Sequence, residues 1–279
     1  MLTKSMTKRK TNKELAFLHE LFVATDWGER FAELMDEHLQ LPKEGRALYL
    51  GSGTGGHAIA LQERSGDKLK FLCIDENPES LELARAKATV LKDATEFRHG
   101  TLDRLVLPDN TFDLVVGDGS LVHTERIPAM LDEMTRVAAP GATLALTLPT
   151  FSSFGEFFSI YWEALHNRGL LDHESDVERL ISTLPSVSAV EEMSEQAGLD
   201  KVESWTRIEE FEYDSGEKFL SAPLISNFLM PLWLGTLPED SYDQVQKEIG
   251  RLINEERHEA EFALSVKATL VVGRKALNQ

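Results

Sequence analysis

The chain has 279 residues, which is enough for one large domain or two small ones. It carries 29 Lys and Arg against 47 Asp and Glu, and the net charge of −18 disfavours a protein that binds the phosphate backbone of nucleic acid. Cys73 is the single cysteine, so the sequence excludes an internal disulfide and a zinc cluster built on cysteines, and we expect a cytoplasmic protein without a metal site.

The first half of the chain predicts two N-terminal helices and then a β/α alternation. Apolar residues recur at helical spacing between residues 14 and 40. Short apolar strands are expected at 46–50, 69–75, 95–99, 112–117 and 142–148, with helices at 56–64, 78–91 and 127–137 between them. Near-continuous apolar strands separated by helices predict a parallel sheet that is covered on both faces.

The pattern changes after Pro149. An aromatic-rich helical segment is expected over 151–171, a helix over 187–197, a strand over 202–213, a helix over 241–259 and a closing strand over 262–273. We interpret residues 1–279 as a single domain with N-terminal helices (1–45), a cofactor-binding core (46–150), helical lid insertions (151–186 and 214–240) and a C-terminal part of the sheet and its helices (187–213 and 241–279).

One stretch has nearly the length of a membrane span. Residues 219–237 include no charged side chain over 19 positions. Pro223 and Pro231 interrupt it, and each internal proline removes a helix hydrogen bond. We therefore expect two short apolar helices that cover an apolar surface, and no insertion into a membrane.

A glycine-rich turn follows the first strand. The sequence LYLGSGTGG spans residues 48–56, and glycines at this position let a ligand approach the backbone where a helix begins. Asp75 ends the next strand, where a carboxylate can accept hydrogen bonds from a ribose diol. The two features predict a nucleoside-containing cofactor. The glycines alone fit two patterns, GxGxxG through Gly51, Gly53 and Gly56, and GxGxG through Gly51, Gly53 and Gly55.

Four segments in order decide between these patterns. They are ALYLGSGTGGHAIAL, FLCIDENPESLELARAKA, LPDNTFDLVVGDGSLVH and RVAAPGATLALTLP. Together, residues 47–148 resemble the class I S-adenosylmethionine-dependent methyltransferases. The resemblance implies an α/β fold with a Rossmann-like, mostly parallel seven-stranded sheet, helices on both faces and an antiparallel last strand. It also implies S-adenosylmethionine as the cofactor and S-adenosylhomocysteine as the product.

The resemblance assigns roles to single residues. Those expected to contact the cofactor are Tyr49, Gly51, Ser52, Gly53, Gly55, Asp75, Glu76, Asn77, Thr101, Leu102, Asp118 and Gly119. Of these, Gly51, Ser52 and Gly53 would line its methionine portion, and Asp75 would bind the ribose. Asp118 and Gly119 would lie beside the reactive sulfonium, and Asp118 and His123 are the expected catalytic residues.

Two positions depart from the family pattern, which usually has an acidic residue at each. Tyr49 stands where that acid helps to place the methionyl ammonium group, and Thr101 stands where it accepts from the adenine amino group. These departures leave a non-catalytic, methyltransferase-like binding protein as an alternative. The GxGxxG pattern leaves a nicotinamide-dependent oxidoreductase as a second one.

The acceptor is expected to be a small, apolar or aromatic metabolite. Apolar side chains crowd the two insertions, and the expected substrate-binding residues are Phe154, Phe158, Tyr161, Trp162, Phe228 and Trp233. Residues 1–150 hold 18 basic and 23 acidic residues, a net −5, and residues 151–279 hold 11 and 24, a net −13. The half that forms the expected substrate cover would thus repel a polyanion, which again disfavours nucleic acid. The sequence leaves the oligomeric state open.

Overall fold

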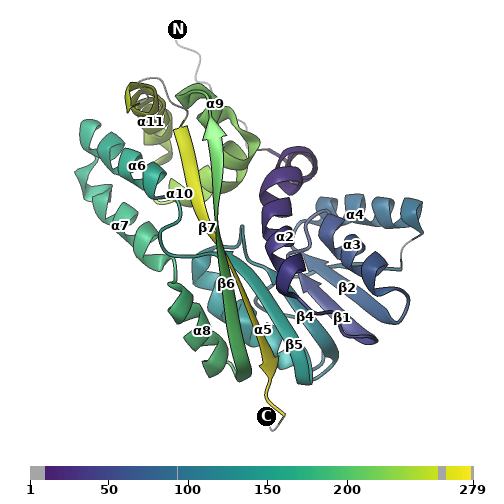
Figure 1. Ribbon diagram of the computed structural model, residues 1–279. Coiled ribbons are helices and arrows are strands. Elements are labelled where there is room, and N and C mark those ends of the chain that lie inside the picture. Colours follow the sequence, from purple (N-terminus) through teal and green to yellow (C-terminus); the bar gives the residue numbers. More distant parts are fainter. Residues whose placement is uncertain (1–9, 93, 257–261, 278–279) are drawn as a thin grey trace.

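A computed structural model describes residues 10–92, 94–256 and 262–277 (Figure 1). Its centre is a seven-stranded sheet with the strand order β3-β2-β1-β4-β5-β7-β6. Neighbours from β3 to β5 are parallel, whereas β7 is antiparallel to both β5 and β6. This confirms the expected mostly parallel sheet with an antiparallel last strand.

The chain begins with a continuous helical segment. It consists of α1 (Asn12–Leu18), a π-helical stretch η1 (His19–Gly28) and α2 (Glu29–His38). Thr11 caps α1 in a capping box with Glu14. The expected separation into two helices is therefore replaced by a π-helical stretch that joins α1 to α2 without a break.

The β/α core follows with the expected alternation. Its strands are β1 (Gly45–Leu50), β2 (Leu69–Asp75), β3 (Glu96–His99), β4 (Phe112–Asp118) and β5 (Ala138–Pro149). Its helices are α3 (Gly56–Ser65), α4 (Pro78–Leu91), the 3-10 turn η2 (Thr124–Arg126) and α5 (Ile127–Val137). The parallel register places the carboxyl ends of β1, β2 and β4 at one edge of the sheet, where ligands bind in folds of this kind.

Alternate side chains of the core strands enter two separate apolar clusters. On β1, Ala47 and Tyr49 join a cluster with α2, α3 and α4, whereas Leu48 and Leu50 join a second cluster with α5 and α8 (Val187–Gln196). Because successive side chains of a strand point to opposite faces, both faces of this strand are buried. This explains why β1 and β4 have apolar residues in unbroken runs.

The C-terminal half adds two long strands and a group of helices. The strands β6 (Leu199–Tyr213) and β7 (Phe262–Lys275) pair with each other almost throughout. Helices gather around the far end of this pair in Figure 1: α6 (Gly155–Asn167), α9 (Gly216–Ser221), α10 (Met230–Trp233) and α11 (Tyr242–Glu256). Shorter or flanking elements are η3 (Leu171–His173), α7 (Glu174–Thr183), the π-helical η4 (Ile225–Leu229) and η5 (Glu239–Ser241).

Residues 219–237 form short elements, as expected. The end of α9, η4 and α10 divide this stretch, and Pro231 lies in the first turn of α10. In the part of the chain that the structure describes, no helix is both long and apolar enough to cross a bilayer.

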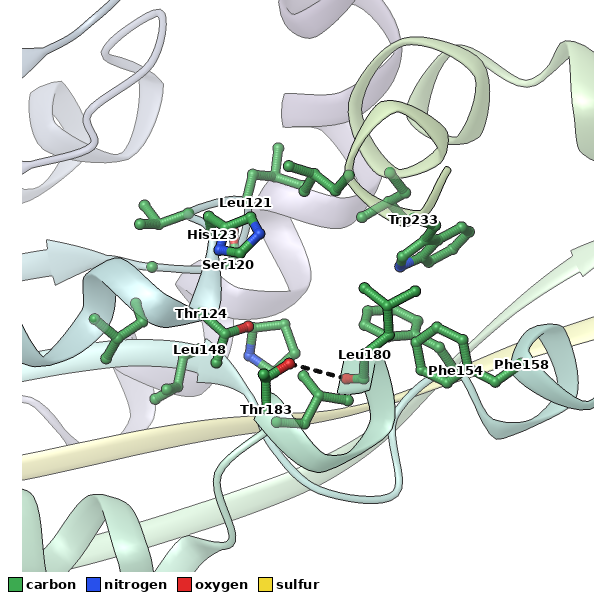
Figure 2. Close-up of a pocket in the computed structure, with 17 residues that line it drawn as sticks. Ser120, Leu121, His123, Thr124, Leu148, Phe154, Phe158, Leu180, Thr183 and Trp233 are labelled. Atoms are coloured by element: carbon green, nitrogen blue, oxygen red, sulfur yellow. Dashed lines mark hydrogen bonds between the residues drawn. The ribbon is translucent and has the colours of Figure 1, made fainter. Parts of the chain in front are cut away.

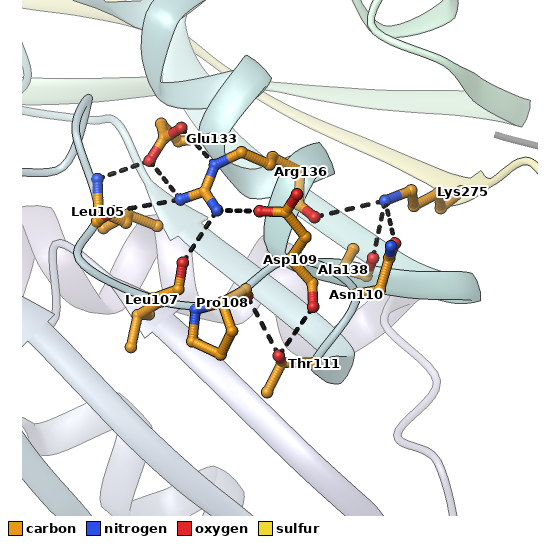
Figure 3. Close-up of polar contacts among 10 residues, drawn as sticks. All are labelled: Leu105, Leu107, Pro108, Asp109, Asn110, Thr111, Glu133, Arg136, Ala138 and Lys275. Atoms are coloured by element: carbon orange, nitrogen blue, oxygen red, sulfur yellow. Dashed lines mark hydrogen bonds and ion pairs between the residues drawn. The ribbon is translucent and has the colours of Figure 1, made fainter.

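Polar contacts attach the last strand to α5 and to the loop before β4 (Figure 3). Lys275 is buried, and its Nζ donates to Asn110 Oδ1 at 2.7 Å and to the carbonyl of Ala138 at 2.9 Å. Arg136 donates from its guanidinium to Glu133, Asp109 and the carbonyls of Leu105 and Leu107. These bonds use basic side chains to satisfy carbonyls at the C-terminal end of α5 and in the loop between β3 and β4.

Candidate functional site

The glycine-rich turn follows β1 directly and lies beside the end of β4. Gly51 has φ +72°, and a Cβ added there would lie 2.5 Å from the carbonyl oxygen of Asp118. Only glycine allows this approach of the two strand ends. Gly51, Ser52 and Gly53 line a cavity of about 780 Å³, called here the large cavity. Gly55 faces Phe97 and Ala84 instead, and it is not among the lining residues.

Asp75 lies in the large cavity at the end of β2, as expected. Its Oδ2 accepts from the backbone N–H of Gly53 and its Oδ1 from that of Asn77, both at 2.8 Å. Burial raises the pKa of the Asp75 carboxyl above its ordinary value of 3.8, and the two backbone hydrogen bonds oppose that rise. The carboxylate is therefore held in a fixed orientation, and its remaining lone pairs can accept hydrogen bonds from a ligand.

Asn77 lies beside Asp75 and starts α4. Its Oδ1 accepts from the Glu79 N–H at 3.0 Å, and Pro78 follows in the first turn of the helix. The Asn77 side chain also donates to the carbonyl of Asn12 at 3.2 Å, which connects this helix start to α1.

Next to Asp75, the cavity wall includes Glu76, which belongs to an ion-pair group. Arg126 contacts Glu76 at 2.5 and 2.9 Å and Asp103 at 2.7 Å. The Arg126 guanidinium lowers the pKa of the Glu76 carboxyl, so Glu76 stays ionised. Glu76 also accepts from the Leu102 N–H at 3.3 Å, and both residues line the cavity.

Thr101 does not line the cavity, although it was expected to contact the cofactor. Its hydroxyl donates to the carbonyl of Arg104 at 2.9 Å, and the neighbouring Leu102 lines the cavity instead.

Tyr49, which departs from the family pattern, is part of a hydrogen-bonded chain along the other wall. Its hydroxyl lies 2.9 Å from His57 Nδ1, and His57 Nε2 lies 3.0 Å from Asp36 Oδ1. Arg64 also pairs with Asp36, at 2.6 Å. Burial raises the pKa of Tyr49 well above its ordinary value, and the phenol stays protonated. In place of an acidic residue, the cavity therefore has a neutral hydroxyl whose partner is the His57 ring.

The N-terminal helices cover the large cavity, and no spacing in the sequence pointed to this contact. His19, Glu20 and Trp27 all line the cavity. Glu20 pairs with Lys87 of α4, with Nζ–Oε distances of 2.8 and 2.9 Å, and Trp27 Nε1 donates to Ser120 Oγ at 3.0 Å. The cover is thus fixed to both sides of the strand ends.

Among the described residues that line the large cavity, two buried side-chain polar atoms have no hydrogen-bond partner. They are His19 Nδ1 and Ser52 Oγ, and both are buried from solvent. Buried polar atoms in a folded protein are almost always paired, so two orphaned atoms in one cavity indicate that a polar ligand belongs there. A zwitterionic nucleoside cofactor fits this set of groups, because Asp75 can accept from hydroxyls while His19 and Ser52 offer polar contacts elsewhere in the cavity.

A second, apolar pocket of about 70 Å³ adjoins the large cavity and shares Ser120, Leu121 and Val122 with it (Figure 2). Phe154, Phe158 and Trp233 lie on one side of it in Figure 2, and His123 lies on the other. Asp118 lines the large cavity and accepts from the Ser120 N–H at 2.9 Å, whereas Gly119 lines the apolar pocket. The expected catalytic residues Asp118 and His123 thus lie on the two sides of the Ser120–Val122 segment.

The remaining aromatic residues are distributed over three environments. Phe228 lines the large cavity, where its ring meets that of His19 at a centroid distance of 5.9 Å. Tyr161 is fully buried in the core, where it stacks on Phe157. Trp162 is exposed and stacks on His166. Neither Tyr161 nor Trp162 lines either cavity, so the structure does not bring these two expected substrate-binding residues to the site.

Comparison with known proteins agrees with the fold and the glycine turn. Residues 47–141 match the family model described as a methyltransferase domain. The demethylmenaquinone methyltransferase of Bacillus cereus (strain ATCC 10987 / NRS 248) is 28% identical over 188 residues, which cover 63% of this chain and 77% of that protein. A relative with the same name from Bacillus anthracis (strain A0248) is 27% identical over the same length.

Solved structures share the architecture at low sequence identity. The YcgJ protein of Bacillus subtilis superposes with a TM-score of 0.58 at 18% identity, over 89% of this chain and 99% of that one. A phosphoethanolamine N-methyltransferase of Haemonchus contortus, solved with S-adenosylhomocysteine, gives a TM-score of 0.57 at 16% identity, over 96% of this chain and 59% of that one. At these identities the likeness concerns the fold.

Proposed function

We propose that this chain, a class I S-adenosylmethionine-dependent methyltransferase, transfers the methyl group to a small acceptor with an apolar or aromatic part. The observation that carries the proposal is the juxtaposition of two spaces. A large cavity at the carboxyl ends of the strands, whose lining includes the carboxylates of Asp75 and Asp118, shares the Ser120–Val122 segment with a pocket lined mainly by apolar side chains. The first suits a nucleoside cofactor, and the second suits an apolar group of the acceptor.

Residues of the large cavity would hold the cofactor. Asp75 would accept hydrogen bonds from the ribose hydroxyls, since its orientation is already fixed by two backbone N–H groups. Glu76 and Leu102 would lie beside the adenosine, and Asp118 would face the ammonium group. When bound, S-adenosylmethionine supplies an activated methyl group on its sulfonium.

The chain's own contribution to the reaction is alignment, exclusion of water and acceptance of a proton. Phe154, Phe158 and Trp233 would hold the apolar part of the acceptor and keep water away from it. His123 lines the same pocket and is the candidate base for an acceptor that must lose a proton. Its side chain is 44% exposed, so a proton taken up there can pass to solvent.

The names of two relatives from Bacillus support the proposal that the acceptor has an apolar or aromatic part. Both proteins are named demethylmenaquinone methyltransferases, so the acceptor in their names is demethylmenaquinone. The apolar lining of the pocket and the surplus of acid in residues 151–279 both favour such a compound over an anionic one. The acceptor class is thus argued from the chemistry of the pocket together with these names.

The test is an assay of S-adenosylhomocysteine formation with a panel of acceptors. The panel contains 1,4-naphthohydroquinone, 1-naphthol and phenol as apolar members, and phosphoethanolamine and glycine as charged members. We expect product with at least one apolar member and none with the charged ones. Turnover confined to the charged members would contradict the acceptor class, and failure to bind S-adenosylmethionine would contradict the enzyme assignment.

A further inference from the structure

The N-terminal cover, residues 12–38, carries apolar side chains on both of its faces. Its inner face lines the large cavity through side chains such as Leu15. On its outer face, Phe17, Leu21 and Phe22 are 46%, 59% and 52% exposed. Large apolar side chains that gather on one surface and remain in contact with water are typical of a site that another surface covers.

Basic side chains continue this outer face toward the start of the helix. Lys13, Phe17 and Leu21 follow one another at intervals of four residues, and all three are exposed. Side chains at this spacing lie one above the other on the same side of a helix. Lys10, which precedes the cap of α1, is exposed as well. The outer face thus begins with positive charge and continues with apolar side chains.

The sequence concentrates positive charge at this end of the described helix. Residues 1–13 contain five basic and no acidic side chains. Residues 14–279 hold the other 24 basic residues and all 47 acidic ones, a net −23. An anionic surface would therefore attract the first segment and repel most of the remaining protein, so the approach would be oriented.

The acidic side chains of α1 and η1 have partners within the protein. Glu20 binds Lys87 of α4 at 2.8 Å, and Asp26 binds Arg30 of α2 at 2.8 Å. Glu14 is held in the capping box at the start of α1. Because these carboxylates are already bound, they oppose an approaching anion less than free carboxylates would.

An anionic lipid bilayer is the partner that uses both properties of the outer face. Its headgroups attract Lys and Arg, and the boundary of its acyl region accepts Phe and Leu side chains. A nucleic acid would leave the apolar side chains in water, and a purely apolar partner would leave the basic ones without a counter-ion. A helix of this composition lies in the plane of the membrane surface, so docking requires no spanning helix.

We propose that the outer face, formed by Lys10, Lys13, Phe17, Leu21 and Phe22, docks this protein on the surface of an anionic membrane. The inner face of the same segment lines the large cavity, so docking places that cavity beside the lipid. Under the proposed function, an apolar acceptor dissolved in the bilayer would then be close to the site. The docking itself goes beyond that function and needs neither cofactor nor acceptor.

Co-sedimentation with vesicles tests the two parts of the outer face separately. The vesicles contain phosphatidylcholine alone, or phosphatidylcholine with about a third phosphatidylglycerol. We expect binding to the anionic vesicles only, and weaker binding at about 0.5 M than at about 0.1 M salt. The pair Lys10→Gln and Lys13→Gln should weaken it about tenfold, and so should the pair Phe17→Ser and Leu21→Ser.

Matched control pairs change the same residue types elsewhere on the surface. Lys68→Gln with Lys70→Gln alters two exposed lysines at the start of β2. Val106→Ser with Leu277→Ser alters two apolar side chains that are 97% and 75% exposed. Both control pairs should bind vesicles like the wild type, and thermal unfolding should show that all four paired variants are folded.

A fluorescent label gives a second readout, which electrostatic attraction alone would not change. Cys73 is the single cysteine and is buried, so a cysteine introduced at an exposed position can be labelled selectively. A polarity-sensitive dye on Leu21→Cys should shift its emission to shorter wavelength when anionic vesicles are added. The same dye on Val106→Cys should show no shift.

Three outcomes would overturn the docking proposal. The first is the absence of binding to anionic vesicles, or binding that neither outer-face pair weakens. The second is binding of heparin without binding of vesicles, which would assign the basic residues to a polyanion. The third is a dimer, detected by sedimentation velocity, that Phe17→Ser with Leu21→Ser dissociates while vesicles are not bound. None of these results bears on the proposed function, which is tested by formation of S-adenosylhomocysteine.

Discussion

Trp27 and Ser120 are 93 positions apart in the sequence, yet Trp27 Nε1 donates a buried 3.0 Å hydrogen bond to Ser120 Oγ. The bond connects η1 to the segment that follows β4, where the large cavity and the apolar pocket meet. It therefore joins the N-terminal cover to the place where cofactor and acceptor would meet.

This hydrogen bond should be measurable as a coupling between the two residues. In a double-mutant cycle of Trp27→Phe and Ser120→Ala, we expect a coupling free energy of about 0.5–1.5 kcal/mol in urea unfolding. Trp27→Phe alone will cost more, because the indole is fully buried against Phe31 and Phe211. Strictly additive single variants would show that the bond contributes nothing to the attachment of the cover.

A polar side chain in the wall of the apolar pocket should weaken the binding of an apolar acceptor. Leu232 of α10 lines it and is only partly buried, so Leu232→Gln changes the chemistry of the wall with little effect on the core. We expect the KM for an apolar acceptor to rise about tenfold, with the affinity for S-adenosylmethionine unchanged. Leu91→Gln on α4, where Leu91 is 55% exposed, is the control. An unchanged KM would place the acceptor elsewhere.

Glu248 should make the fold sensitive to acid. Its carboxylate is nearly buried in α11 and binds Arg251 at 2.6 Å, Asn167 at 3.0 Å and Arg168. The hydrogen bond from Arg251 is the main cause that lowers the pKa of Glu248 from 4.5 to about 2. Since this pKa is depressed in the folded state, the stabilisation is present above pH 4.5 and is lost as the pH falls toward 2.

Glu248→Gln tests that dependence. At pH 7 the variant should be less stable by about 1–3 kcal/mol, and the difference from wild type should shrink between pH 4.5 and 2. Urea unfolding at pH 7, 4.5 and 3 measures it, with the exposed Glu163→Gln of α6 as the control. A constant difference across this range would mean that Glu248 keeps an ordinary pKa.

The sequence predicted the parts of the site that belong to local patterns. The glycine turn and Asp75 follow strands of the alternating core, and strand ends in a parallel sheet meet at one edge. The aromatic residues of the insertions were predicted as a group, and Phe154, Phe158 and Trp233 do line the apolar pocket. Helical periodicity could not separate them from Tyr161, because a core-facing and a pocket-facing side chain can lie on the same helix.

The contacts of the N-terminal cover could not be predicted in this way. His19 and Trp27 reach the cavity from a π-helical stretch, whose five-residue hydrogen-bond spacing shifts side chains away from the positions that α-helical periodicity assigns. Thr101 illustrates a second limit, since its hydroxyl is used by a carbonyl three residues further along the chain. Local side-chain to backbone bonds of this kind are not visible in a family motif.

The most direct test of the account is the affinity for S-adenosylmethionine of the wild type and of Asp75→Ala, measured by calorimetry. Asp113→Ala is the control, because Asp113 accepts from the Arg46 N–H at the opposite edge of the sheet. We predict binding by the wild type and the control, and at least a tenfold loss in Asp75→Ala, about 1.4 kcal/mol. Equal affinity in all three proteins would contradict the assignment of the cofactor to this cavity.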